Sequence, residues 1–157
     1  MNQSHQISRS DEEWMRYALS LALKAAGEGE VPVGAVAVKN GLVIGEGYNR
    51  KETTNDPTAH AEILALTQAS GTLENWRLID VTLYSTLEPC PMCAGAMIQA
   101  RLSRLVYGAR DVRFGADGTV VDVLNSNSFN HKVDVDRGIL ETESAALMQA
   151  FFRSLRK

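Results

Sequence analysis

The chain has 157 residues, of which 45% are hydrophobic and 22% are charged, and its formal net charge is −3 at pH 7. This composition is ordinary for a globular protein, and a chain of this length buries about 70% of its unfolded surface without needing disulfides. A membrane-spanning helix is excluded because the longest apolar run, residues 31–38, is far too short.

The first ten residues are polar and lack the apolar core of a signal peptide. We therefore expect a flexible tail over residues 1–10 and a single domain over residues 11–157. Both cysteines belong to one short motif, which leaves none for a disulfide framework and favours a cytoplasmic protein. Ser10 and Glu13 have the spacing of a capping box, and apolar residues at helical spacing as far as Ala25 predict the first helix.

Two strands are predicted next. Residues 31–39 and 42–48 are joined by Asn40-Gly41, which is the strongest short signal for a β-hairpin. The sheet is therefore expected to begin with an antiparallel pair.

Asp56-Pro57-Thr58 predicts the start of a second helix, because Asp or Thr can serve as its cap and Pro is tolerated in the first turn. His60 and Glu62 would then lie in that first turn. Residues 61–66 leave almost no polar face, so we expect this helix to be buried.

A strand–helix–strand unit follows the polar connection of residues 71–79. Its strands are predicted at residues 81–86 and 105–108, and Pro91 suits the first position of the helix between them, which is again apolar all round. A crossover of this length requires parallel pairing. The chain is therefore predicted to be an α/β protein whose mixed sheet carries helices on both faces.

The last part of the chain begins with an irregular segment over residues 109–130. Residues 133–135 are predicted to form a short fifth strand, and residues 140–156 an amphipathic helix. That helix would place four apolar residues roughly on one face: Leu140, Leu147, Phe151 and Leu155.

His60, Cys90 and Cys93 form a set of nitrogen and sulfur donors that suits zinc. The other histidines, His5 and His131, lie in the tail and far downstream, so water is the expected fourth ligand and the site is catalytic rather than structural. Zinc lowers the pKa of a bound water to about 7, which makes hydroxide available to attack the amidine carbon of an aminated base.

Glu62 is the predicted proton carrier of this site and is not expected to bind the metal. Its role would be to take a proton from water, pass it to the ring nitrogen and later protonate the departing ammonia. A Cys-x-x-Cys pair alone could instead be a redox dithiol. That interpretation leaves the His-x-Glu segment and Pro89 unexplained.

The two segments together, His-x-Glu and Pro-Cys-x-x-Cys, resemble the signature of zinc-dependent deaminases. That signature is shared by cytidine, guanine and pyrimidine deaminases. Further segments resemble the bacterial tRNA wobble-adenosine deaminases, and the similarity spans residues 11–156. These segments are Gly47-Tyr48-Asn49, residues 56–62, residues 93–97, Gly108-Ala109-Arg110-Asp111 and Phe151-Phe152-Arg153.

The resemblance implies a three-layer α/β/α, cytidine-deaminase-like fold, one zinc ion per chain, a homodimer, and deamination of adenosine to inosine at the wobble position of a tRNA anticodon. It also implies that Asn49 and Ala61 contact the bound nucleotide, although Asn49 could instead be a turn residue. Two alternatives stay open: a free-base, nucleoside or cytosine deaminase on the same scaffold, and a non-catalytic zinc-stabilised RNA-binding module. Glu62 argues against the second, because a structural zinc site has no use for an unligated carboxylate.

A net negative charge argues against a nucleic-acid partner, but the charges are unevenly distributed. Residues 11–30 hold five acids and two bases, whereas residues 99–113 hold four arginines and one acid. We expect this strip and the basic C-terminus to contact phosphates of the tRNA anticodon stem-loop. The basic residues concerned are Arg101, Arg104, Arg110, Arg113, Arg153, Arg156 and Lys157.

Asp111 is the acid within this strip. We hypothesise that it accepts a hydrogen bond from a ribose 2′-hydroxyl, with a surface ion pair between Asp111 and Arg110 as the alternative. Phe151 and Phe152 are adjacent and cannot both face the core of one helix. Phe152, beside Arg153, is predicted to stack on a splayed base.

Overall fold

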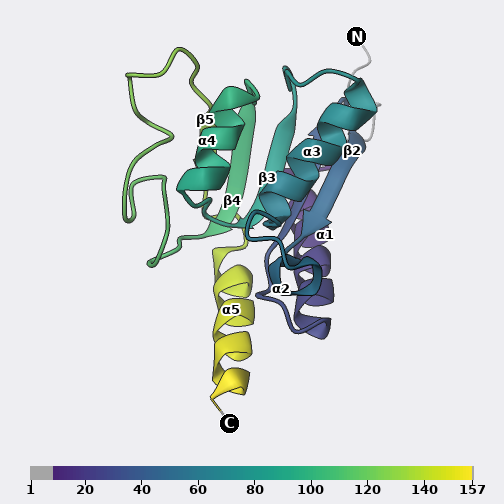
Figure 1. Cartoon of the computed structure of the whole chain (residues 1–157), viewed down its shortest axis with the longest axis vertical. Helices are drawn as coiled ribbons and strands as arrows, with labels where there is room; N and C mark the ends of the chain where they lie inside the picture. The colour runs from purple at the N-terminus through teal and green to yellow at the C-terminus, as the bar shows by residue number, and fades with distance from the viewer. Residues whose placement is uncertain (1–8, 157) are drawn as a thin grey trace.

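The computed structural model describes residues 9–156, so the predicted tail over residues 1–10 lies almost entirely outside the described residues. Within residues 9–156 the chain forms a five-stranded sheet in the order β2-β1-β3-β4-β5 (Figure 1). The strands are β1 (Gly34–Lys39), β2 (Leu42–Tyr48), β3 (Thr82–Leu87), β4 (Arg104–Ala109) and β5 (Asp134–Arg137). β1 pairs antiparallel with β2 and β3, whereas β3, β4 and β5 run parallel. The predicted mixed sheet is confirmed.

Helices cover both faces of the sheet, which confirms the three-layer arrangement (Figure 1). The helices are α1 (Asp11–Gly27), α2 (Lys51–Thr54), α3 (Ala61–Leu73), α4 (Pro91–Gln99) and α5 (Glu141–Leu155). Alternate strand residues divide between the two cores. Val36 and Val106 pack with α1, whereas Ala37 and Leu105 pack with α3 and α4. α5 extends past the sheet toward the C-terminus (Figure 1).

The structure confirms the predicted capping box at the start of α1 and the predicted tight turn between β1 and β2. The Ser10 hydroxyl accepts a hydrogen bond from the Glu13 N–H at 3.2 Å, and the Glu13 carboxylate accepts one from the Ser10 N–H at 2.9 Å. Asn40 and Gly41 both have positive φ, as the tight turn between β1 and β2 requires.

Close packing of helices on the sheet depends on glycine. A Cβ atom on Gly34 would lie 2.1 Å from the Ala18 carbonyl oxygen of α1, and one on Gly45 would lie 2.4 Å from the Ala65 carbonyl oxygen of α3. Because these neighbours are backbone atoms, the two helices could not remain where they are above a larger residue.

Three predicted boundaries are wrong: the start of the first strand and both ends of the second predicted helix. β1 begins at Gly34 and not at Val31, because Pro32 has no N–H for a sheet ladder. The helix expected from Asp56 begins only at Ala61, since the Asp56 carboxylate accepts hydrogen bonds from the N–H and hydroxyl of Thr58 and forms a turn. Its end was also predicted too early, because α3 continues to Leu73.

Two expectations about burial are also wrong. α3 is not buried on all sides, because it packs on the sheet by one face and leaves Thr67 and Gln68 exposed. On α5, Leu155 is 63% exposed because the helix has by then passed beyond the sheet. No helix among the described residues is both long enough and apolar enough to span a membrane.

Candidate active site

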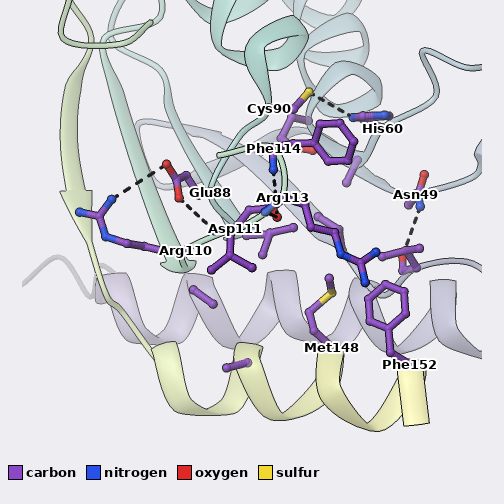
Figure 2. A pocket seen from close by; sticks show the side chains of 18 of the residues that line it. Asn49, His60, Glu88, Cys90, Arg110, Asp111, Arg113, Phe114, Met148 and Phe152 are labelled. Atoms are coloured by element: carbon purple, nitrogen blue, oxygen red, sulfur yellow. Dashed lines mark hydrogen bonds and ion pairs between the residues drawn. The ribbon is translucent and has the colours of Figure 1, made fainter. Parts of the chain in front are cut away.

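A cavity of about 1030 Å³ opens at the carboxyl ends of the parallel strands β3 and β4. Leu87 ends β3, Ala109 ends β4, and both residues line the cavity. Ligands commonly bind at this edge of α/β sheets, where the loops that follow the strands converge. The walls come from the starts of α3 and α4, the loop after β4, and α5 (Figure 2).

His60, Cys90 and Cys93 place their nitrogen and sulfur atoms within 4.8 Å of one another beside this cavity. Nδ1 of His60 lies 3.6 Å from Sγ of Cys90 and 3.5 Å from Sγ of Cys93. A nitrogen and a sulfur ligand of a tetrahedral zinc ion are expected roughly 3.6 Å apart, given bonds of about 2.1 and 2.3 Å. The predicted ligands are thus brought together, and both the kind of donor and the spacing fit zinc.

Two helix starts hold these ligands in place. His60 is the N-cap of α3 and Cys90 the N-cap of α4, while Cys93 lies in the first turn of α4. The free N–H groups of a first turn and the positive end of the helix dipole favour negatively charged thiolates. The predicted placement of both motif segments at helix starts is therefore confirmed, with His60 one position before its helix.

The pKa values of the two cysteines shift in opposite directions. A hydrogen bond from the Cys93 thiol, supported by His60, lowers the pKa of Cys90 to about 4. That same hydrogen bond, together with burial, raises the pKa of Cys93. The Cys90 thiolate also raises the pKa of His60. A metal that binds all three residues must therefore displace a proton from Cys93.

Glu62 lies in the first turn of α3 and is only 4% exposed. Burial raises its pKa to about 7, and the negative charge of Cys90 adds to this shift. Among the described residues, its carboxylate is not part of the cluster of possible metal ligands. A carboxyl group with a pKa near neutrality can both accept and donate a proton, as the predicted role of Glu62 requires.

Asn49 and Ala61 both line the cavity, where the sequence analysis expected nucleotide contacts. Asn49 Nδ2 donates to the Val31 carbonyl at 3.4 Å, and its Oδ1 accepts from the Lys51 N–H at 3.4 Å. The bond to Lys51 agrees with the alternative role as a turn residue. Both bonds are long, so the amide can exchange them for a nucleotide, and this contact stays a prediction.

The predicted arginine strip is wrong as a continuous surface. Arg110 and Arg113 line the cavity, but Arg104 lies at the opposite end of β4, roughly 20 Å away along the strand. The guanidinium of Arg104 is neutralised there by Asp11 and Asp136, each at 2.7 Å. Arg104 and Arg110 are close in the sequence, but in the structure they lie at opposite ends of β4.

Asp111 lies in the loop after β4, on the wall of the cavity (Figure 2). Its carboxylate accepts hydrogen bonds from the N–H groups of Arg113 at 3.0 Å and Phe114 at 3.3 Å. The ion pair that Arg110 forms is with Glu88, at 4.0 Å, so the alternative of an Arg110–Asp111 pair is not what the structure contains.

Phe152 and Arg153 of α5 line the cavity across from this loop. The Arg113 guanidinium lies 4.8 Å from the centre of the Phe152 ring (Figure 2). The Phe151 ring meets that of Phe152 edge-on, with the ring centres 5.5 Å apart. An aromatic ring is therefore present at the cavity, and its stacking on a base stays a prediction.

Lys51 and Glu88 also line the cavity, although neither was predicted to do so. Lys51 belongs to α2, which has no local sequence signal, because its N–H groups bind the distant carboxylate of Glu30. Glu88 could have been noticed as an acid directly after an apolar strand and before Pro89, where a solvent-facing residue is not expected.

The sequence matches the family of MafB19-like deaminases over residues 9–156. A tRNA-specific adenosine deaminase of Bacillus subtilis is 47% identical over 147 residues, which cover 94% of this chain and 91% of that protein. A solved structure from work on A-to-I editing by tRNA:A34 deaminases at the wobble position of transfer RNA is 44% identical. It superposes with a TM-score of 0.82 over 85% of this chain and 97% of its own. A guanine deaminase from Nitrosomonas europaea is 27% identical, with a TM-score of 0.77 over 93% of this chain and 86% of its own.

The site makes a prediction that separates metal binding from chemistry. Cys93→Ala should lose the metal and lower the melting temperature, because the metal joins the starts of α3 and α4. Glu62→Gln should keep one metal per chain and lose at least about a hundredfold in rate. Metal content by mass spectrometry and thermal unfolding provide the test. Loss of metal from Glu62→Gln would make Glu62 a ligand and contradict its assigned role.

Proposed function

The chain belongs to the deaminase family that includes the bacterial tRNA-specific adenosine deaminases, and we propose that it converts adenosine to inosine at the wobble position of a tRNA anticodon. One observation carries the proposal. The His60, Cys90 and Cys93 cluster and the buried Glu62 lie beside a cavity whose rim is rich in cations. We also propose a cytoplasmic location, where tRNA is found and both thiols stay reduced.

The reaction consumes adenosine and water and yields inosine and ammonia. One zinc ion per chain, held by His60, Cys90 and Cys93, would supply a Lewis acid that activates water for attack on the amidine carbon. Glu62 takes the proton released by the attacking water and delivers it to the ring nitrogen. It then carries a second proton to the departing amine, which leaves as ammonia. A pKa of about 7 lets Glu62 perform both transfers near neutral pH.

The size and charge of the cavity favour a polynucleotide over a free base. At about 1030 Å³ it is at the upper end of the range for ligand pockets and exceeds the space that one nucleobase needs. Its lining includes five cationic residues: Lys51, Arg110, Arg113, Arg153 and Arg156. Cations at the rim can hold phosphates on either side of a target nucleotide, while Asn49 and Ala61 contact the nucleotide itself.

The main alternative is deamination of a free base, and the structural similarity to a guanine deaminase is the observation that favours it. A small-molecule enzyme has no need for cations on three separate segments around its cavity. The other alternative, a non-catalytic zinc module, does not explain why Glu62 is buried beside the metal-ligand cluster without belonging to it.

We also propose that the protein is a homodimer whose second copy covers the exposed groove between α3 and α4. Both helices were expected to be buried because they are apolar, yet the single chain leaves apolar side chains of each facing a groove. Trp76 in this groove is 53% exposed. A second copy would bury this apolar surface on the two helices that carry the metal ligands.

The substrate assignment predicts that the zinc-loaded protein forms inosine in an anticodon stem-loop RNA with adenosine at the wobble position. Free adenosine, guanine and cytidine should not be converted. RNA binding should weaken steeply with salt, and Arg153→Ala should reduce the log–log slope by about 1. Arg101→Ala is the control: the sequence predicted that Arg101 contacts phosphate, but it is not among the residues that line the cavity, and its guanidinium donates to the Ile98 carbonyl. A flat salt response with turnover of a free base would favour the alternative.

The proposed contact of Asp111 with a 2′-hydroxyl predicts a change in the preference for RNA over DNA. Asp111→Asn keeps a weaker acceptor and removes a charge that repels phosphate, so it should lose activity on RNA and gain relative activity on single-stranded DNA. A charged acceptor is typically worth about 1.5–3 kcal/mol, or roughly a tenfold change or more. The measurement is kcat/KM on matched RNA and DNA stem-loops, with the exposed Asp134→Asn as the control. An unchanged ratio would leave Asp111 without this role.

The homodimer predicts that a charge placed in the α3–α4 groove separates the two copies. Trp76→Arg should yield a monomer by light scattering, whereas Leu23→Arg, at a 58% exposed site on α1, should leave the dimer intact. A monomeric wild type, or a Trp76→Arg dimer as stable as the wild type, would contradict the proposed interface.

A further inference from the structure

Glu88 is a buried acid that the deamination chemistry does not use. It follows β3 directly and is only 1% exposed. Its carboxylate accepts three hydrogen bonds, from the N–H of Asp111 at 2.9 Å, the N–H of Asp117 at 2.8 Å and the hydroxyl of Thr119 at 2.6 Å. All three donors belong to one segment, residues 111–119, which follows β4 and forms a wall of the cavity.

This segment contains no helix and no strand of the sheet, so side-chain and turn hydrogen bonds keep its shape. The Asp117 carboxylate holds one end of the segment through Tyr107 and Arg137, and Glu88 is the carboxylate that joins its two ends. The segment folds tightly around the Glu88 carboxylate. A Cβ atom on Gly115 would lie 2.4 Å from Glu88 Oε1 and 2.5 Å from the Asp111 carbonyl oxygen. The absence of a side chain at residue 115 is therefore what allows the loop to close on the carboxylate.

Glu88 also orients Arg110, through Thr119. An Arg110 Nη1 group donates to the Thr119 hydroxyl at 3.0 Å, and that hydroxyl donates in turn to Glu88 Oε1. The same guanidinium nitrogen lies 4.0 Å from Glu88 Oε2 (Figure 2). One carboxylate thus sets the positions of Asp111 and Arg110, two of the residues proposed to contact RNA.

A carboxylate suits this position because every group that faces it is a donor. Gln has almost the same shape, but one of its two terminal atoms is an NH₂ group, which would face the N–H of Asp111 or Asp117. A buried N–H that loses its acceptor is costly, so the loop would move away to find water.

We infer that Glu88 is a positioning residue for RNA recognition: its carboxylate holds residues 110–119 in the conformation in which Arg110, Asp111 and Arg113 face the substrate. This inference rests on the proposed function and deepens it. Glu88 acts through the loop and touches neither the target base nor the metal ligands' donor atoms. Its loss should therefore weaken substrate binding and leave the chemical step intact.

The experiment compares Glu88→Gln with the zinc-loaded wild type. Amide hydrogen exchange within residues 110–119 should become faster, while exchange within β1 stays unchanged. On the anticodon stem-loop RNA, KM should rise about tenfold, as the loss of a charge-assisted hydrogen bond implies, with kcat within about twofold. Zinc content should stay at one per chain.

Asp11→Asn is the matched control, because Asp11 is also a carboxylate that accepts several hydrogen bonds, but it binds Arg104 and Tyr84 at the other end of the sheet. It should leave exchange in residues 110–119 and KM at wild-type values. If Glu88→Gln unfolds, Thr119→Val serves in its place. This substitution removes the Thr119 hydroxyl, which links Glu88 to Arg110, while the Glu88 carboxylate keeps its hydrogen bonds from the N–H groups of Asp111 and Asp117. It should raise KM by about threefold, as the loss of one neutral hydrogen bond implies.

The inference would be overturned if amide hydrogen exchange within residues 110–119 were unchanged in Glu88→Gln. It would also be overturned if exchange became faster while KM stayed unchanged, or if the substitution lowered only kcat. The exchange measurement requires no substrate. Faster loop exchange in a protein whose wild type does not deaminate the RNA would therefore refute the proposed function and still support the anchoring role of Glu88.

Discussion

The convergence of two helix N-termini is the constraint on which the rest of the site depends. His60 is the N-cap of α3 and Cys90 is the N-cap of α4, and their donor atoms are 3.6 Å apart although the two residues are thirty positions apart in the sequence. α3 can reach this position only because the backbone of β2 lies directly beneath it at Gly45. α4 reaches it because it follows the central strand β3. Tetrahedral coordination tolerates little change in these distances, so the packing of α3 on the hairpin is also a condition for metal binding.

The buried carboxylates of the protein differ in how many hydrogen-bond donors their oxygens receive. Burial alone would raise the pKa of Glu30, but hydrogen bonds from Thr53 and Glu52 hold it below its ordinary value. Asp117 is likewise buried, and its pKa is held low by Arg137, Tyr107 and Asn125. Such carboxylates stay charged and organise loops.

Glu62 differs from these residues because burial dominates over the hydrogen bonding that it receives, and its pKa rises to about 7. A carboxyl group that is buried with few donors is destabilised as an anion and is therefore able to exchange protons at neutral pH. Proteins usually offset the free-energy cost of burying a carboxylate with hydrogen bonds, and this cost is left largely uncompensated at Glu62, the residue proposed to move protons. The structure thus assigns different roles to chemically identical side chains by the donors placed around them.

The sequence by itself predicted the class of fold, and it indicated the three residues proposed as metal ligands and the acid proposed to carry protons beside them. These features are local: a cap, a turn or a pair of ligands within one helical turn is specified by residues a few positions apart, as at Ser10 and at Asn40-Gly41. Only the tertiary structure decided which charges meet the cavity. Arg104 and Arg110 are close in sequence, but a strand separates them and delivers Arg104 to Asp11 and Asp136. α2 and the hydrogen-bond partners of Glu88 could not be predicted for the corresponding reason: the groups that bind them are more than twenty residues away, and long-range contacts leave no periodic pattern in the chain.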